Sequence, residues 1–267
     1  MVSDLVLVET SGSVATVTLN NPASRNPISD LEMVDALVGA LERINADRQI
    51  RVGILTGRGT VFSSGGNLDK MGIPGGLGGG EPADTPRGYT RGIQRIPLAI
   101  QALEIPMIAA VNGPAVGAGC DLACMCDIRI AAQSARFAES FVKLGLIPGD
   151  GGAWLLQRIV GFSKACELTF TGDAIDAGEA LACGLVSRVV PDAELMSTAL
   201  ALAARIAANP PHALRMARRL MIQARTAPLD QHLESAAAFQ ALAHTTADHR
   251  DAVAAFKAGK SRKSQGK

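Results

Sequence analysis

The chain has 267 residues and nearly balanced charges, with 26 basic and 25 acidic residues and a formal net charge of +1. This balance argues against nucleic acid or an anionic membrane as the main partner. Only 3% of the residues are aromatic, which also disfavours a base-stacking surface. The length is sufficient for a full hydrophobic core, as one domain or as one domain with a helical appendage.

The amino-terminal segment lacks the features of a signal peptide, because Asp4 and Glu9 interrupt its apolar run and no basic region precedes that run. No stretch approaches the ~18 uninterrupted apolar residues of a membrane-spanning helix. The five cysteines are odd in number and lack a disulfide spacing, which favours reduced thiols in the cytoplasm. All four histidines lie in the last quarter of the chain, so no metal site is predicted.

Strand patterns and helix patterns alternate along most of the chain. Residues 5–9 and 14–19 predict a β-hairpin, and Ser29 with Glu32 predicts a capping box that opens a helix over 30–46. Further strands are predicted at 52–56, 107–111, 128–132 and 185–190. Further helices are predicted at 87–104, 117–125, 151–160, 163–170, 176–182, 194–208, 213–224, 229–243 and 248–257. The glycine-rich segment 72–80 predicts a mobile loop.

Two of the predicted strands run directly into glycine-rich loops. The first loop contains Gly65 and Gly66, and the second contains Gly117-Ala118-Gly119 at the start of a predicted helix. Small residues leave backbone N–H groups uncovered, and two such groups aimed at one point make an oxyanion hole. The first N–H groups of a helix also favour negative charge. The alternative interpretation is close packing of a helix against a strand, which requires small residues as well.

Three acidic residues follow the second loop. Asp121 lies one helical turn beyond Gly117, on the side where a ligand would bind, although a satisfied polar residue or an ion pair would also explain it. Asp150 directly precedes a predicted helix, so a role as N-cap or first-turn acid is its alternative. Glu139 is a third candidate. Two such acids near a thioester suit general acid–base chemistry.

Other catalytic patterns are missing from the sequence. There is no GxSxG motif, and no histidine precedes residue 200, which disfavours a Ser/His/Asp triad. The paired glycines lack the third glycine of a dinucleotide-binding fingerprint, and no Walker lysine is present.

Together these residues resemble the crotonase superfamily, also called the enoyl-CoA hydratase/isomerase family. The resemblance extends over nearly the whole chain, through segments 20–28, 62–68, 110–130, 144–152, 184–186 and 248–256. Its most specific part is the second glycine loop and its continuation to Arg129. The resemblance implies an α/β fold, a crotonase-like spiral of ββα units over residues 1–208, and a C-terminal helical trimerisation region over 209–267.

The resemblance also implies a binding site for an acyl-CoA. The N–H groups of Gly66 and Ala118 would form the oxyanion hole for the thioester carbonyl. Arg25 would lie near the coenzyme A moiety, and the adenine and pantetheine side would be lined by Ser64, Gly66, Asn67 and Leu68. No metal or separate cofactor is expected, because coenzyme A is part of the substrate.

Departures from the family pattern limit what the resemblance predicts. The well-studied hydratases have two catalytic glutamates; Asp121 matches the first, but Phe141 matches the second and cannot transfer a proton. Asn67 replaces the usual aspartate of the first loop. Dienoyl-CoA isomerases and ring-processing isomerases have an acid at the position of Gly149, one residue before Asp150.

The sequence therefore predicts a 2-enoyl-CoA hydratase with Asp121 and Asp150 or Glu139 as its acid–base residues. A double-bond isomerase in which Asp121 and Asp150 move a proton is the second interpretation. A non-catalytic acyl-CoA binder, suggested by Phe141, is the third. Apolar residues in the C-terminal helices predict a homotrimer or hexamer. These apolar residues are Leu214, Met221, Leu233, Phe239 and Leu242.

Overall fold

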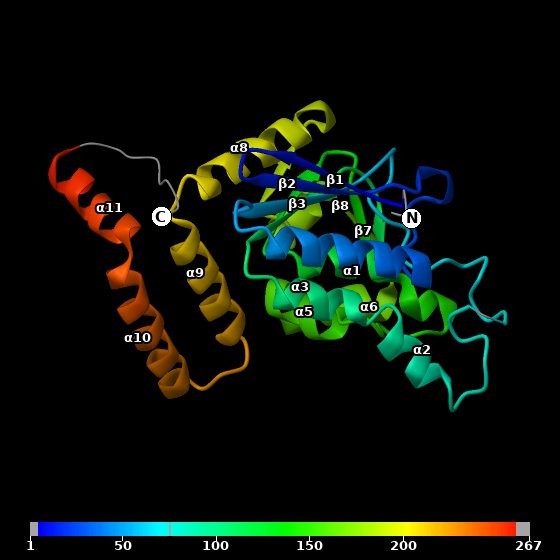
Figure 1. The fold of residues 1–267 in the computed structure, drawn as a ribbon. Coiled ribbons are helices and arrows are strands. Elements are labelled where there is room, and N and C mark those ends of the chain that lie inside the picture. Colours follow the sequence, from blue (N-terminus) through cyan, green and yellow to red (C-terminus); the bar gives the residue numbers. More distant parts are fainter. Residues whose placement is uncertain (1–4, 75, 260–267) are drawn as a thin grey trace.

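The computed structural model describes residues 5–74 and 76–259. Within these residues, the strands of the larger sheet are β1 (Val6–Ser11), β2 (Val14–Leu19), β3 (Val52–Gly57), β4 (Met107–Val111), β6 (Ile128–Ala132) and β9 (Arg188–Val190). They lie side by side in the order β1-β2-β3-β4-β6-β9, and β1, β2 and β3 are labelled in Figure 1. The β1–β2 hairpin is antiparallel, and each following pair is parallel. The predicted hairpin and the strands at 52–56, 107–111 and 128–132 are confirmed.

A smaller sheet forms beside the second glycine loop. It consists of β5 (Ala115–Val116), β7 (Arg136–Ala138) and β8 (Ala174–Asp176), with β7 in the middle. The sequence did not predict these strands, because runs of two or three residues are too short to show a period. The predicted strand at 185–190 is also shorter in the structure, where β9 begins at Arg188.

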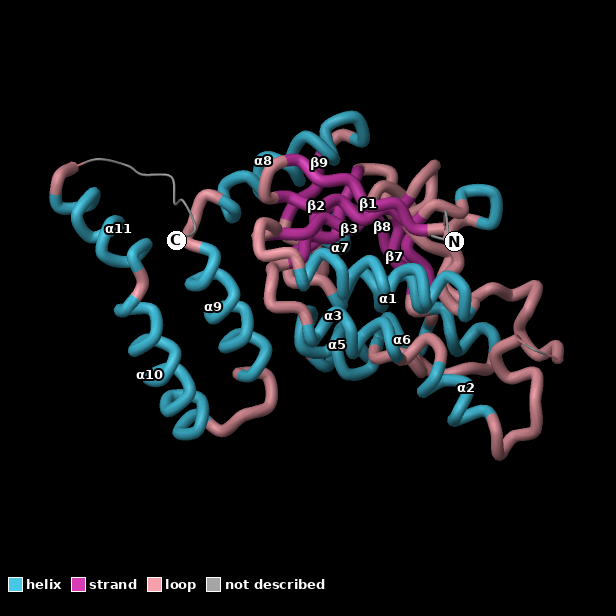
Figure 2. The backbone as a smooth tube through the Cα atoms, in the orientation of Figure 1, coloured by secondary structure: helices cyan, strands magenta, loops and turns pink. Residues whose placement is uncertain are grey.

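Helices cover both faces of the larger sheet (Figure 2). Those before the C-terminal region are α1 (Leu31–Ala46), α2 (Thr85–Arg91), α3 (Arg95–Ala102), α4 (Ala118–Met125), α5 (Gly152–Val160), α6 (Phe162–Thr171), α7 (Ala177–Ala182) and α8 (Leu195–Ala207). Short 3₁₀ helices occur at η1 (Pro22–Ser24), η2 (Ser140–Leu144) and η3 (Asp192–Glu194). Helix α1 buries Met33, Leu37 and Leu41 in the main core, whereas α8 packs Ala199 and Ala203 on the opposite face. Burial on both faces explains the continuous apolar runs of the parallel strands.

The C-terminal helices α9 (Pro211–Gln223), α10 (Leu229–Thr245) and α11 (Ala247–Lys257) extend away from the sheet (Figure 1). The buried Arg218 anchors α9: its guanidinium donates to Asp127 Oδ2 (2.8 Å) and to the carbonyl oxygens of Ile100 (2.9 Å) and Leu103. The boundary predicted at residue 208 lies between α8 and α9; that the two parts are separate domains stays a prediction. No helix among residues 5–74 and 76–259 has the length and hydrophobicity to cross a membrane.

Two local predictions are wrong. The capping box at Ser29 is not formed, because Asp30 is the N-cap residue of α1. The Ser29 hydroxyl instead accepts a hydrogen bond from the backbone N–H of Asn67 (2.8 Å). The single helix predicted over 87–104 is broken into α2 and α3 at Gly92. A Cβ at Gly92 would lie 2.6 Å from the Gly88 carbonyl oxygen, so the bend there requires glycine. The predicted mobility of 72–80 stays a prediction, and residue 75 lies outside the described residues.

Candidate active site

The two glycine-rich loops lie backbone against backbone. Val116 N donates to Ser63 O (3.0 Å), and Ser63 N donates to Pro114 O (3.2 Å). A Cβ at Gly65 would lie 2.3 Å from Val116 O, and a Cβ at Gly119 would lie 2.3 Å from Ser63 O. Both distances are far below van der Waals contact, so these two positions accept glycine alone. The contact holds together the two loops that follow the paired strands β3 and β4.

The predicted amide donors, those of Gly66 and Ala118, line the same cavity. Ala118 is the first residue of α4, and Gly117 before it has a positive φ of 53°, which favours glycine. Among the described residues, neither amide donates a hydrogen bond. Two unpaired N–H groups from separate elements therefore border one hollow, as an oxyanion hole requires.

The cavity has a volume of about 100 Å³ and walls that are mainly apolar. Phe141 from η2 and Asp150 from the loop before α5 both line it. Among the described residues that line the cavity, Asp150 is the single acid. Asp121 and Glu139 lie behind this wall, 0% and 2% exposed.

Asp121, Glu139 and Asp150 form a buried carboxyl cluster with Asp121 in the middle. The Asp121 carboxyl is close enough to Glu139 and Asp150 for both of their charges to act on it. None of the six carboxyl oxygens accepts a bond from any other described group. Since ionised carboxylates can only accept hydrogen bonds, a hydrogen bond between two of these groups requires that one of them holds a proton. The three acids that the sequence singled out are thus brought together.

Burial changes the acidity of the whole cluster. It raises the pKa of Asp121 well above the ordinary value, and the charges of Glu139 and Asp150 raise it further. Burial also raises the pKa of Asp150, and that of Glu139 to about 7. Low polarity and like charge both oppose ionisation. The cluster therefore retains a proton at neutral pH and titrates as a unit.

The structure contradicts two alternative interpretations of the acids. The N-cap of α5 is Gly151 rather than Asp150, and the Asp150 oxygens accept no backbone N–H bond. Asp121 has no hydrogen-bonded cation among the described residues, so it is not half of an ion pair. A Cβ at Gly152 would lie 2.0 Å from Asp121 Oδ1, so glycine there makes room for the carboxyl.

A groove next to the cavity contains the residues predicted for the coenzyme A side. It measures about 320 Å³ and is lined by Arg25, Ser64, Gly66, Asn67 and Leu68 among others. Asn67 Nδ2 donates to Asp30 Oδ2 (2.8 Å), a bond that the family's usual aspartate would lose. Arg25 has a left-handed backbone (φ 64°) and its carbonyl accepts from Ser64 N (2.9 Å). This segment therefore holds the first glycine loop in place.

Sequence reasoning missed Tyr89, which also lines the cavity. Its ring touches the loop before α5, because a Cβ at Gly149 would lie 2.8 Å from Tyr89 Cε1. Burial and the nearby Asp150 charge raise the pKa of Tyr89. The available signal was its rarity, since it is the one tyrosine of the sequence.

Comparisons with known proteins agree on one family. The sequence pattern of the enoyl-CoA hydratase/isomerase family matches residues 9–264. The chain is 37% identical to the short-chain-enoyl-CoA hydratase of Clostridium acetobutylicum over 260 residues, 94% of each chain. It is 37% identical to the 1,2-epoxyphenylacetyl-CoA isomerase of Escherichia coli over 265 residues, 99% of each chain. The crystal structure of an enoyl-CoA hydratase from Bacillus anthracis superposes with a TM-score of 0.90 at 32% identity, covering 98% of this chain and 100% of the other. The expected family and α/β fold are confirmed.

The raised pKa of Glu139 predicts a pH-dependent stability. Between its ordinary value of 4.5 and about 7, the folded protein binds more protons at this site than the unfolded chain. Stability therefore falls as pH rises through this window, by up to about 3 kcal/mol. We expect Glu139→Gln to reduce this fall, as measured by urea unfolding at pH 4.5 and pH 8, while the raised pKa values of Asp121 and Asp150 leave part of it in place. The exposed Glu234→Gln is the matched control, and equal pH dependence in Glu139→Gln and wild type would contradict the prediction.

Proposed function

Because the chain belongs to the enoyl-CoA hydratase/isomerase family, we propose that it is an enoyl-CoA hydratase, which adds water to the double bond of a 2-enoyl-CoA. One observation carries the proposal. Two unpaired backbone amides and the Asp150 carboxyl border a single apolar cavity, and the buried Asp121 carboxyl lies behind Asp150. The amides suit a thioester oxygen that gains charge, and the carboxyl pair suits proton transfer beside it.

The thioester oxygen would accept hydrogen bonds from the N–H groups of Gly66 and Ala118. Addition of a nucleophile at Cβ moves negative charge onto this oxygen, so the two bonds strengthen as the reaction proceeds. The position of Ala118 at the first turn of α4 adds the positive end of the helix dipole. Neither amide has to give up a hydrogen bond to a described residue.

The carboxyl pair of Asp150 and Asp121 would supply the base and the acid. Asp150 lines the cavity, so its carboxylate accepts a proton from water as the water oxygen bonds to Cβ. A proton from the pair then passes to Cα as the enolate collapses to the thioester. One proton enters the pair and one leaves it, so the pair is regenerated. Phe141 supplies an apolar wall for the acyl chain.

A double-bond isomerase is the second candidate. It is supported by the likeness to the Escherichia coli isomerase over 99% of the chain and by the single acidic residue among the described residues of the cavity wall. In this reaction Asp150 would remove a proton from one carbon and the pair would return a proton to another. No water is consumed. The third candidate, a non-catalytic acyl-CoA binder, is supported by Phe141 alone.

Coenzyme A would lie in the groove lined by Arg25, Ser64, Asn67 and Leu68. The proposed reaction uses no metal or separate cofactor, because both the electrophile and coenzyme A belong to the substrate. We also propose a cytoplasmic location, which the five free cysteines support.

Isotope-labelled water separates the candidates. Crotonyl-CoA and a 3-enoyl-CoA are each incubated with the enzyme in heavy-oxygen water, and the masses of the products are measured by mass spectrometry. We expect heavy oxygen in a 3-hydroxyacyl-CoA. A shifted double bond without heavy oxygen would establish the isomerase instead. Binding of acyl-CoA without change in either substrate, across a series of chain lengths, would contradict both reactions.

Replacement of Asp150 tests its role in proton transfer. We expect Asp150→Asn to lower kcat by about a hundredfold or more, because the amide cannot accept a proton from water. Acyl-CoA affinity, measured by calorimetry, should stay within about threefold, since the oxyanion donors remain. The exposed Asp230→Asn on α10 is the matched control. Unchanged turnover in Asp150→Asn would remove Asp150 from the mechanism.

We further propose that the protein assembles as a homotrimer or hexamer through its C-terminal helices. Helix α10 buries none of its described residues, while its Leu229, Leu233 and Leu242 are 72%, 57% and 60% exposed. Apolar side chains gathered on an extended arm favour a protein partner. Light scattering at micromolar concentration should give three or six times the chain mass of 27.6 kDa. A monomeric mass would refute this assembly.

A further inference from the structure

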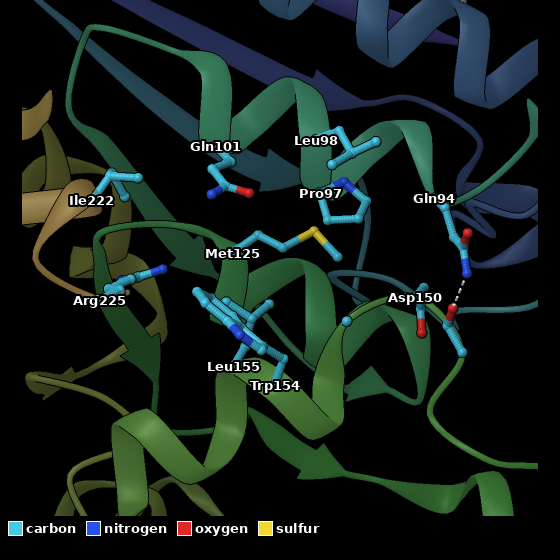
Figure 3. A pocket seen from close by; sticks show the side chains of 12 residues that line it. Gln94, Pro97, Leu98, Gln101, Met125, Asp150, Trp154, Leu155, Ile222 and Arg225 are labelled. Carbon is cyan, nitrogen blue, oxygen red and sulfur yellow. Dashed lines mark hydrogen bonds between the residues drawn. The ribbon is translucent and has the colours of Figure 1, made fainter. Parts of the chain in front are cut away.

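A second and larger cavity adjoins the proposed catalytic cavity (Figure 3). It measures about 280 Å³ and lies between α3, α5 and the end of α9. Gly149 and Asp150 line both cavities. On its other side, the catalytic cavity shares Ser64, Gly66 and Leu68 with the groove for coenzyme A. The groove for coenzyme A, the catalytic cavity and the second cavity are therefore neighbours in that order. Asp150 lies between the catalytic cavity and the second cavity.

The lining of the second cavity is apolar in the middle and polar at both ends (Figure 3). At the end near Asp150, Gln94 Nε2 donates to the Gly149 carbonyl (2.7 Å). Arg225 and Gln101 lie at the far end. The apolar lining between them consists of Pro97, Leu98, Met125, Trp154 and Leu155. This distribution matches a hydrocarbon chain with a polar terminus.

Arg225 has an unused guanidinium. It points toward Met125 and Trp154 (Figure 3), with its central carbon 5.7 Å from the centre of the Trp154 ring. Its guanidinium forms no hydrogen bond or ion pair with another described residue. Arg158, which stacks closer on the same ring at 4.0 Å, differs because it donates to the Trp154 carbonyl (2.7 Å) and does not line the cavity.

Cations outnumber anions among the charged groups that act on Arg225. Arg129, Arg158 and Arg218 act on Arg225 as neighbouring cations, and Asp127 as a neighbouring anion. The Asp127 carboxylate is already engaged by Arg218 Nε (2.8 Å) and by Met107 N (2.8 Å). Burial, aided by the cations, lowers the pKa of Arg225, but an arginine stays protonated at neutral pH. A half-buried, unpaired cation of this kind attracts an anion.

We propose that the acyl group of the substrate ends in a carboxylate, and that Arg225 binds this carboxylate in the second cavity. The proposal rests on the proposed function, because it places the reacting carbons at Asp150 and the rest of the acyl chain beyond it. The planar guanidinium offers two parallel N–H donors to a carboxylate, and Gln101 offers another. A methyl-terminated chain would leave the guanidinium without a hydrogen-bond acceptor from the substrate. The substrate class is therefore the monothioester of a dicarboxylic acid.

Matched pairs of substrates test the proposal. The kcat/KM values are compared for 2-enoyl-CoA thioesters of six to twelve carbons that end either in a methyl group or in a carboxylate. At one chain length or more, we expect wild type to prefer the carboxylate by about tenfold or more. Arg225→Gln should abolish this preference while changing methyl-terminated turnover by less than about threefold. Arg158→Gln, which removes the neighbouring cation outside the cavity, should retain it.

Calorimetry with saturated acyl-CoA thioesters of both kinds makes the test independent of turnover. Tighter binding of the carboxylate-terminated ligand in wild type, lost in Arg225→Gln, would support the proposal even if no hydration occurred. Hydration with equal or better use of methyl-terminated substrates at every length would overturn it and leave the proposed function standing. An equal loss for both substrate types in Arg225→Gln would also overturn it, because Arg225 would then have only a structural role.

Discussion

The close contact between two glycine loops is the constraint on which the site depends. Val116 O and Ser63 O lie where side chains at Gly65 and Gly119 would otherwise extend. Only a residue without Cβ allows two backbones this near, and the approach joins the loops that follow the paired strands β3 and β4. It also fixes the start of α4, whose first amide has no intrahelical acceptor. Close packing and the supply of amide donors thus follow from one contact. The two interpretations of the glycine pattern, an oxyanion hole and close packing of a helix against a strand, are therefore compatible.

Behind this contact the protein buries three carboxyl groups at a cost to stability. Apolar side chains of similar size would fill the same volume more favourably, because buried acids lose hydration and repel one another. Position 152 has to be glycine as well, because a side chain there would occupy the space of the Asp121 carboxyl. A purely structural role leaves this arrangement unexplained. A requirement for a carboxyl group that holds a proton at neutral pH accounts for both the burial and the clustering.

The sequence allowed most of the fold to be predicted because its regular elements carry clear periods. Helix α1 shows the apolar repeat of Met33, Leu37 and Leu41, and the central strands are continuous apolar runs. The three acids of the site could be selected from the sequence because carboxyl groups suit proton transfer. The amides of Gly66 and Ala118 could be selected because small residues leave backbone N–H groups uncovered. That Asp121 lies between Glu139 and Asp150 was not predictable, since tertiary packing sets those contacts. The break at Gly92, the small sheet and the position of Arg225 beside Trp154 depend on long-range contacts in the same way.

The replacement of the family's second glutamate by Phe141 changes how the acids work together. Phe141 and Asp150 line the same cavity from different elements, so an acid can move from η2 to the loop before α5 without altering the fold. Asp150 does not ionise independently of Asp121, because the charge of each buried carboxylate opposes ionisation of the other. In the proposed reaction the substrate would therefore meet a coupled carboxyl pair, whose protonation changes in macroscopic steps. Glu139, on the far side of Asp121, extends the same coupling inward and adjusts how firmly the pair holds a proton.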